Sequence, residues 1–517
     1  MPQGRLKPLT IRAPGLFGLN TQEQLGLLDP LFATVANNLV FDDNDRMAAR
    51  KGWSKTTSSQ IESGADITVL HMYERDKDTQ ILISVCNNKI WSGTSTLTEQ
   101  TGTAGASNNW KFINFESQVI AVSQGRTPVF WDGGAGTDFA NVTATTGSVP
   151  TGDDGVAAYG RLWILDADRL TLKVSGLQDK TKWATADDSA IVDLAEYFPA
   201  VDFAQAIAAF NNLIVVFGLH SILIFTGVHA PVTQLALNDV ILGIGCIARD
   251  SIQDIGDDLI FLDSTGLRSL VRSIELKTQP LQDLTINVRN ELLTDIDNTT
   301  KTLIKSVYNP DDGFYLITLP ATTRHVEYYI DLRRKNPDNS ARIFKWNSIE
   351  LNCMAYDIVS NTLHVGKEGV VGKYDTYTDL DPTDSFSTTS YIAEYKSSWS
   401  DFKSEILKVL KRANLVTIGG SEYQVTFNWA FDFSDIEYTT SFVVPVSTQA
   451  RYNISRYNTH RYSGTNTDIN NNTIELTHAG QFAQVGWKAA IDGDAFAIQS
   501  ISMFAKTGRL ATSGDRW

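Results

Sequence analysis

A chain of 517 residues is long enough to bury a large core and to form one big domain with one or two smaller ones. Apolar residues make up 42% of the chain and charged residues 20%, a composition that excludes a disordered chain and a collagen-like fibre. The formal net charge of −15 repels phosphate backbones, so tight wrapping of nucleic acid is disfavoured.

Residues 1–60 are predicted to form an N-terminal arm that belongs to a larger domain. Its opening, MPQGRLKPLTIRAPG, lacks the apolar core of a signal peptide, so we expect the chain to be made and used in a cytosol. The most apolar run, residues 213–225, is interrupted by Gly218, His220 and Ser221. Because a membrane-spanning helix needs roughly 20 apolar residues, no spanning segment is expected.

Seven related units follow within residues 61–380. In each unit an apolar strand of about five residues leads through a polar turn into a second strand, as antiparallel hairpins do. The strongest runs begin near Thr79, Gln118, Arg161, Asn212, Asp258, Gly313 and Asn361. Their spacing of roughly 40 to 55 residues is close to that of a four-stranded propeller blade.

The hairpins need partners because a single hairpin cannot bury both of its faces. Radial stacking around an axis satisfies this need and also hides the strand edges. The predicted fold is therefore mainly β, with a propeller of about seven blades, and six or eight blades are alternatives. A series of hairpins in two β-sandwiches is the competing interpretation.

Residues 381–517 are predicted to form a second β-rich part. The polar passage DTYTDLDPTDSFSTTS, residues 375–390, has the composition of a domain boundary. Strands are expected at residues 391–399, 423–433 and 495–504, where apolar and polar residues alternate. Residues 404–420 fit either a short helix or a strand that enters a Gly-Gly turn, and we favour the strand.

The sequence contains none of the motifs that mark common catalytic centres. It has no GxSxG before a helix, no HExxH and no GxxxxGK[ST]. Two carboxylate pairs, Asp166 with Asp168 and Asp492 with Asp494, could form an acid/base pair, but solvated turn carboxylates are far commoner. We therefore expect no enzyme activity.

Metal and cofactor sites are not expected either. The cysteines, Cys86, Cys246 and Cys353, are odd in number and far apart, which favours buried free thiols over a disulfide framework. The seven histidines do not cluster along the sequence: His71, His220, His229, His325, His364, His460 and His478.

An unusual loop repeats Arg-Tyr every five residues in RYNISRYNTHRYSG. Neither helix nor strand periodicity produces this spacing. Arg and Tyr are enriched at protein interfaces, so we favour a subunit or partner contact. A merely exposed loop and a nucleic-acid contact through stacking are the alternatives. The residues concerned are Arg451, Tyr452, Arg456, Tyr457, Arg461 and Tyr462.

Both ends of the chain carry passages that encode turns, strands and packing faces rather than chemistry. The arm contains APGLFGLN, then LDPLFATVANN and finally RKGW, and the C-terminal part contains SSWSDFKSEILKVLKRANLV and SISMFAKTGR. In combination these passages resemble the tail hub, or nozzle, proteins of short-tailed bacteriophages. Those proteins begin with "APG…GLN…LDP…A…N…GR…RKG" before a propeller. This chain has Asp45-Arg46 where Gly-Arg is usual.

The resemblance implies a structural protein of the virion tail that is assembled in the host cytoplasm. In the resembled architecture, residues 1–60 and 381–517 pair into a platform domain that assembles as a ring, commonly a hexamer, below the portal and adaptor proteins. Tail fibres are further candidate partners. The arm then supplies candidate assembly contacts: Arg12, Asn37, Asn38 and Arg50.

A ring of this kind would extend the portal channel, retain packaged DNA and let double-stranded DNA pass during ejection without specific binding. The alternative is a receptor-binding or glycan-degrading tail spike, which is typically trimeric. A third interpretation is an eight-bladed or sandwich scaffold that serves as a host interaction module.

Overall fold

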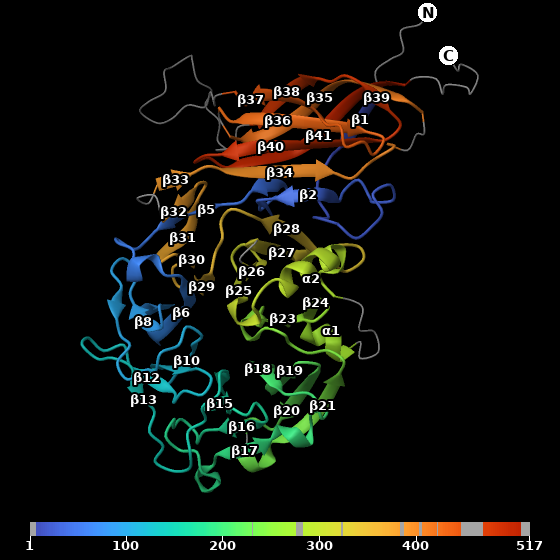
Figure 1. The fold of residues 1–517 in the computed structure, drawn as a ribbon. Coiled ribbons are helices and arrows are strands. Elements are labelled where there is room, and N and C mark those ends of the chain that lie inside the picture. Colours follow the sequence, from blue (N-terminus) through green and yellow to red (C-terminus); the bar gives the residue numbers. More distant parts are fainter. Residues whose placement is uncertain are drawn as a thin grey trace, which may run out of the picture.

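The computed structural model describes residues 7–507, apart from residues 230, 276–282, 322–323, 383–386, 403–405, 421 and 446–468. Within these residues the chain is mainly β. Small sheets are arranged radially as a β-propeller, and a platform of strands lies beyond one side of it (Figure 1). The predicted fold class is confirmed.

Four blades are regular four-stranded sheets in which consecutive strands pair antiparallel. Their strands are β6 (Ile67–Asp76), β7 (Thr79–Cys86), β8 (Lys89–Ser92) and β9 (Thr98–Glu99); β10 (Lys111–Phe115), β11 (Gln118–Val122), β12 (Val129–Trp131) and β13 (Ala140–Asn141); β14 (Gly155–Ala158), β15 (Arg161–Leu165), β16 (Thr171–Val174) and β17 (Ala190–Asp193); and β18 (Ala204–Phe210), β19 (Leu213–Gly218), β20 (Ser221–Thr226) and β21 (Ala236–Leu242).

Three further sectors complete the propeller, and each departs from this plan. One is three-stranded and is followed by two helices, one takes its fourth strand from the arm, and one is the inner part of a nine-stranded sheet. Their elements are β22 (Gln253–Asp254), β23 (Leu259–Asp263), β24 (Gly266–Ser269), α1 (Leu270–Glu275) and α2 (Arg289–Asp297); β29 (Cys353–Asp357), β30 (Thr362–Lys367), β31 (Val370–Thr376) and β5 (Gly52–Lys55); and β25 (Lys305–Asn309), β26 (Phe314–Leu319), β27 (Val326–Lys335) and β28 (Ala341–Trp346).

The first strands of the sectors surround the propeller axis. Contacts between them run from β6 through β10 and β14 to β18, and from β22 through β25 and β29 back to β6. Between β18's blade and β22's blade, the ring of Phe217 packs on that of Phe261 with centroids 4.9 Å apart. In the described part of the chain, six separate sheets serve as blades, and β25–β28 fill the remaining place.

All seven predicted hairpins occur. The apolar runs form the second strand of each sector, and each pairs with the strand that follows it: β7, β11, β15, β19, β23, β26 and β30. Local turn chemistry supports them. Asn211 and Asn212, between β18 and β19, both have positive φ, a conformation that asparagine tolerates and that tight hairpins require.

The platform is a sandwich of two sheets. One contains β1 (Lys7–Ile11), β3 (Leu39–Phe41), β4 (Met47–Ala49), β35 (Lys408–Gly419), β38 (Ile469–Glu475), β39 (Ala479–Gly480) and β41 (Phe496–Thr507). The other continues outward from β28 through β2 (Ala33–Asn37), β34 (Tyr391–Ser397), β40 (Ala483–Ile491), β36 (Gln424–Phe431) and β37 (Tyr438–Val443). Trp487 of β40 meets Phe496 of β41 between the sheets, with ring centroids 5.4 Å apart.

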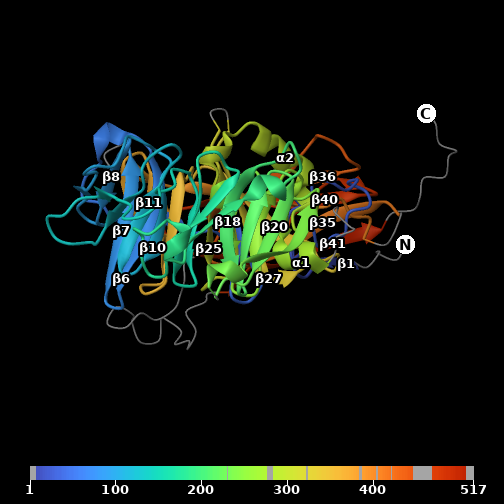
Figure 2. The ribbon, with the colours of Figure 1, turned by 90° about the horizontal axis from the view of Figure 1, so that it is seen from below.

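The C-terminal strands lie where the alternation predicted them, and residues 404–420 contribute the strand β35 rather than a helix. Seen from below, the blade of β6–β8 lies at the left and the platform strands β35, β36, β40 and β41 at the right (Figure 2). A hairpin of β32 (Asp379–Asp381) and β33 (Ser387–Thr389) lies in the predicted boundary. Short 3-10 helices complete the chain: η1 (Glu62–Gly64), η2 (Thr185–Asp187), η3 (Leu194–Glu196), η4 (Val232–Gln234), η5 (Arg249–Ser251), η6 (Ile286–Val288) and η7 (Lys301–Leu303).

Strand β5 belongs to the propeller although it lies within the predicted arm. It pairs antiparallel with β31, so the N-terminal segment closes the last blade and covers an edge that would otherwise be open. The closure is tight. A Cβ atom on Gly52 would lie 2.0 Å from the carbonyl oxygen of Thr378, and the backbone N–H of Trp53 donates to that same oxygen at 3.0 Å.

We expect Gly52→Ala to open this closure, because the methyl group would meet backbone atoms that cannot rotate away. The free energy of unfolding should fall by about 1–3 kcal/mol or more, the usual cost of overpacking. Gly26→Ala is the control, since its Cβ would have an ordinary contact 3.4 Å from the Phe433 ring. Urea unfolding of both variants tests this, and equal stability of the two would contradict it.

Candidate functional site

The predicted assembly residues separate into exposed, buried and undescribed positions. Arg12 is exposed just after β1, and Asn37 is half-buried at the end of β2, whereas Asn38 and Arg50 are buried. The six Arg and Tyr positions of the repeated loop lie outside the described residues, so their interface role stays a prediction: Arg451, Tyr452, Arg456, Tyr457, Arg461 and Tyr462.

Asn38 uses all of its hydrogen-bonding groups inside the chain. Its backbone N–H donates to Lys345, and its carbonyl accepts from the backbone of Arg50. Its side-chain Nδ2 donates to Asn347 Oδ1 at 2.6 Å and to the carbonyl of Ile392 at 2.8 Å. Its Oδ1 accepts from Arg50 Nε and from the backbone of Asn347. With a φ of 57°, Asn38 occupies the left-handed region that asparagine adopts more readily than most residues.

Arg50 lies at the centre of the same junction and its side chain is 0% exposed. Its guanidinium binds Asp379 with two bonds, Nη1 to Oδ1 at 2.7 Å and Nη2 to Oδ2 at 2.5 Å. Its Nη1 also donates to the carbonyl of Lys51. Burial opposes the charge, but Asp379 outweighs it and raises the pKa of Arg50 above its usual value.

Aromatic rings enclose this ion pair. The guanidinium carbon of Arg50 lies 4.1 Å from the ring centre of Tyr391 and 5.8 Å from that of Trp346, within cation–π range. The Tyr391 hydroxyl donates to the carbonyl oxygen of Arg50, and Trp346 Nε1 donates to the carbonyl of Leu39 at 2.9 Å. We call this set of arm, propeller and platform contacts the arm junction.

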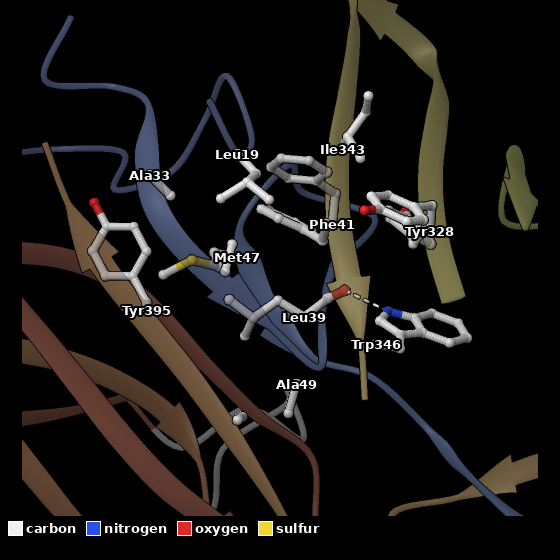
Figure 3. Packing of buried hydrophobic residues seen from close by; sticks show 14 of the residues in the cluster. Leu19, Ala33, Leu39, Phe41, Met47, Ala49, Tyr328, Ile343, Trp346 and Tyr395 are labelled. Carbon is white, nitrogen blue, oxygen red and sulfur yellow. Dashed lines mark hydrogen bonds between the residues drawn. The ribbon is translucent and has the colours of Figure 1, made fainter. Parts of the chain in front are cut away.

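The arm junction continues into apolar packing (Figure 3). Leu19, Leu39, Phe41 and Met47 of the arm pack between β28 on one side and β34 on the other. Asn38 and Arg50 thus hold parts of one protomer together. Their predicted role as contacts between subunits stays a prediction, and their buried position provides no surface for it.

Asp379 is a partner that the sequence did not identify. It lies in the polar passage at residues 375–390, where acidic residues usually face water, yet it is only 4% exposed. No local pattern distinguishes it from its neighbours, because its partner Arg50 is 329 positions away in the chain. The only indication in the sequence is Arg50 itself, which has no acidic neighbour within the RKGW passage.

A second site is a cavity of about 800 Å³ on the propeller axis. It is lined by the first strands β6, β10, β25 and β29 and by the segment from η5 to β22. We call it the axial cavity. Its lining combines apolar side chains with polar and charged ones, among them His71, Lys111, Asp250, Gln253 and Lys305.

The polar group is organised around Asp250 of η5. This carboxylate accepts from Lys305 at 2.6 Å, from Arg249 at 2.9 Å and from Lys111 at 3.3 Å. Although burial opposes ionisation, these three cations hold the pKa of Asp250 well below its usual value. Arg249 Nη2 also donates to Asn109 Oδ1 at 2.8 Å, so η5 ties together sectors that face one another across the axis.

His71 also lines the axial cavity. Its Nε2 lies 2.9 Å from Asn114 Oδ1, and the amide nitrogen of Asn114 donates to the carbonyl of Met72. Asn114 Oδ1 is therefore an acceptor, so Nε2 carries the proton and Nδ1 is left as an acceptor. Burial lowers the pKa of His71 to about 4, which keeps the ring neutral near pH 7.

Of the two carboxylate pairs considered for catalysis, Asp166 and Asp168 have structural partners for their carboxylates. Asp166 forms an ion pair with Lys173 at 2.8 Å, and Asp168 accepts from the backbone and hydroxyl of Thr171 in the same turn. The backbone N–H groups of Asp492 and Asp494 both donate to the hydroxyl of Tyr423. The three cysteines are buried free thiols, as predicted.

Among the described residues, no three His, Cys, Asp or Glu side chains are grouped so that they could hold a metal ion. No helix among the described residues is long and apolar enough to cross a membrane.

Comparisons with known proteins give no family. No family model matches the chain, and no curated protein matches it. Among solved structures the chain is similar to YCF48 bound to D1 peptide, at 10% identity over 63% of this chain and 97% of that one, with a TM-score of 0.36. It is similar to the Pan2 WD40 domain of Neurospora crassa at 7% identity over 63% and 96%, with a TM-score of 0.39.

A further similar structure is PorZ, a surface component of the type-IX secretion system of Porphyromonas gingivalis. The identity is 12% over 65% of this chain, the match covers 39% of PorZ, and the TM-score is 0.34. Such low scores carry no argument about function. The propeller assignment rests on the sheets and contacts described above.

Arg50→Met should destabilise the protein by about 3–5 kcal/mol, because it leaves the Asp379 carboxylate buried without its partner. The matched control is Arg46→Met in the same arm, which removes a partly exposed ion pair with Asp42 and should cost less than about 1 kcal/mol. Free energies of unfolding from urea titrations measure both. A loss for Arg50→Met no larger than for Arg46→Met would show that the arm junction is not a main source of stability.

Proposed function

We propose that the chain is a structural protein of a short-tailed bacteriophage tail, a ring-forming hub that extends the portal channel, helps to retain packaged DNA and passes it during ejection. The observation that supports this most is where the resembling passages lie. The N-terminal passage LDPLFATVANN contains β2, which pairs with β34 in the platform, and the two C-terminal passages contain most of β35 and of β41, which pair with each other there.

The platform also carries exposed apolar side chains suited to a contact between subunits. Leu25 and Leu27 are 46% and 80% exposed, and Phe433 and Ile436 are 45% and 64% exposed. The segment that carries Leu25 and Leu27 passes beside Phe433, because a Cβ on Gly26 would lie 3.4 Å from the Phe433 ring. Exposed apolar groups that gather in this way are typical of interaction sites. We propose that they meet the next copy of the chain in the ring.

The propeller axis does not suit DNA passage. Arg249 and Asp250 link sectors across it, and the axial cavity has the size of a small-molecule site. The proposed DNA channel therefore lies in the centre of the ring, outside each propeller. Portal and adaptor proteins would adjoin this ring, and tail fibres are further candidate partners.

A second candidate function is a receptor-binding tail spike. One observation favours it, namely that the axial cavity is lined by both apolar and polar side chains, as binding sites are. The two functions differ in symmetry, since a spike is typically trimeric whereas a hub should match the portal side.

Leu27→Asp should prevent ring assembly while leaving the protomer folded, because a charge would enter the apolar contact. Val201→Asp, in the loop before β18, is the matched control, since Val201 is 84% exposed and lies in the propeller. Native mass spectrometry would measure the assembly state and circular dichroism the fold. Cryo-electron microscopy of virions would then locate the chain. A trimer, or a position away from the portal, would contradict the hub function.

Assembled rings should bind duplex DNA only weakly at physiological salt. A lining of Lys and Arg would hold the phosphates through counterion release, whereas the net charge of −15 favours a lining of Asp, Glu, Ser, Thr and Asn that lets DNA slide. Retention would then come from a narrow constriction or another protein. Fluorescence anisotropy across a salt series tests this. Micromolar or tighter binding with a steep salt dependence would indicate a basic lining.

A further inference from the structure

The axial cavity has the volume and the composition of a binding site for a small polar molecule. Its volume of about 800 Å³ lies in the range of ligand pockets. Phe112, Val307 and Met354 supply apolar wall, whereas Lys111, His71 and Gln253 supply polar groups. The walls come from several sectors of the propeller, so the cavity exists only in the folded chain.

An ion-pair cluster beside the cavity has three cations on one carboxylate. Arg249, Lys111 and Lys305 share the carboxylate of Asp250. Asp154 is a second nearby carboxylate, but it does not line the cavity and accepts from the backbone of Ile207. Three cations thus share the Asp250 carboxylate, but of these only Lys111 and Lys305 line the cavity, whose lining also includes the carboxylates Glu74 and Asp254. Burial is the main cause of the lowered pKa of Lys305, and the positive charge of Lys111 lowers it further.

Of these cations, Lys111 is the one that a ligand can reach most easily. Its side chain is 33% exposed, whereas those of Lys305 and Arg249 are 9% and 8% exposed. Its contact with Asp250 is also the longest of the three, at 3.3 Å. The lining carboxylates Glu74 and Asp254 are exposed to water, which weakens their effect on the cavity.

His71 provides the complementary group. Its ring is stacked near Phe112, with centroids 5.7 Å apart, and its Nε2–H is used by Asn114. No hydrogen bond to Nδ1 is present within the described chain, so this nitrogen can accept one from a ligand hydroxyl. The cavity thus offers a cation, a hydrogen-bond acceptor and an aromatic surface.

We propose that the axial cavity binds a sugar acid, with its carboxylate on Lys111, a hydroxyl donating to Nδ1 of His71, and an apolar face against the aromatic wall. The source is either a free sugar acid or an acidic residue of a surface polysaccharide. The proposal does not depend on ring assembly.

Isothermal titration calorimetry of the full-length protein with D-glucuronate tests the proposal directly. Glucose, which lacks the carboxylate, and inorganic phosphate, which lacks the sugar ring, should each bind at least tenfold more weakly. Absence of glucuronate binding at millimolar concentration would overturn the proposal. Phosphate binding as tightly as glucuronate would also overturn it, because the cavity would then select charge alone.

Lys111→Met should weaken glucuronate binding at least tenfold. The variant should fold, since Asp250 keeps Arg249 and Lys305 as partners. Lys89→Met is the matched control. Lys89 is 40% exposed and pairs with Glu62 and Glu99, and it does not line the cavity. Equal affinity of the Lys111 and Lys89 variants, both folded by circular dichroism, would overturn the assignment.

His71→Phe removes the acceptor and keeps an aromatic ring, so it should weaken glucuronate binding without weakening phosphate binding. An unchanged affinity for glucuronate would exclude the role of Nδ1 and overturn the proposed geometry. A short glucuronate oligosaccharide distinguishes the two sources. Tighter binding of the oligosaccharide than of the monosaccharide supports a polysaccharide, and equal binding supports a free sugar acid.

Discussion

The structure depends on one buried guanidinium. Arg50 is 0% exposed, Asp379 from the connector neutralises its charge, and Asn38 from the arm and the ring of Tyr391 from the platform complete its contacts. Removing one partner of a buried ion pair destabilises a protein strongly, because the other charge stays buried without compensation. Separation of the arm, connector and platform would therefore break this pair. This constraint fixes the position of the platform relative to the propeller, because a bidentate ion pair requires a defined geometry of both partners.

At the propeller axis, too, a buried charge needs partners of opposite sign, but there the charge cluster lies beside a cavity. Asp250 is held by three cations that belong to different sectors, so the cluster fixes the sectors around the axis. Unlike the arm junction, it borders a cavity of about 800 Å³, and three cations share its one central carboxylate. One buried cluster is complete within the chain, whereas the other leaves Lys111 partly exposed.

Local patterns predicted most of the fold. The hairpins were recognisable because short apolar runs and turn residues such as Asn211 and Asn212 act over a few positions. The features that could not be predicted from the sequence depend on residues far apart in the chain. Strand β5 lies in the arm but pairs with β31, and Asp379 lies in a polar passage but is buried on Arg50. The axial cavity was missed for the same reason, since Lys111, Asp250 and Lys305 are brought together only by closing the propeller.

The nine-stranded sheet has a mechanical consequence. It runs from β25 in the propeller to β37 in the platform, but its seam is narrow, because β2 and β28 are joined by a single parallel pairing of Asn37 with Lys345. On either side of that seam the strands are joined by long antiparallel ladders, such as β34 with β40. We therefore expect each half of the sheet to move as a rigid unit. A force that pulls the platform away from the propeller concentrates on the line between β2 and β28, where Asn38 and Arg50 lie.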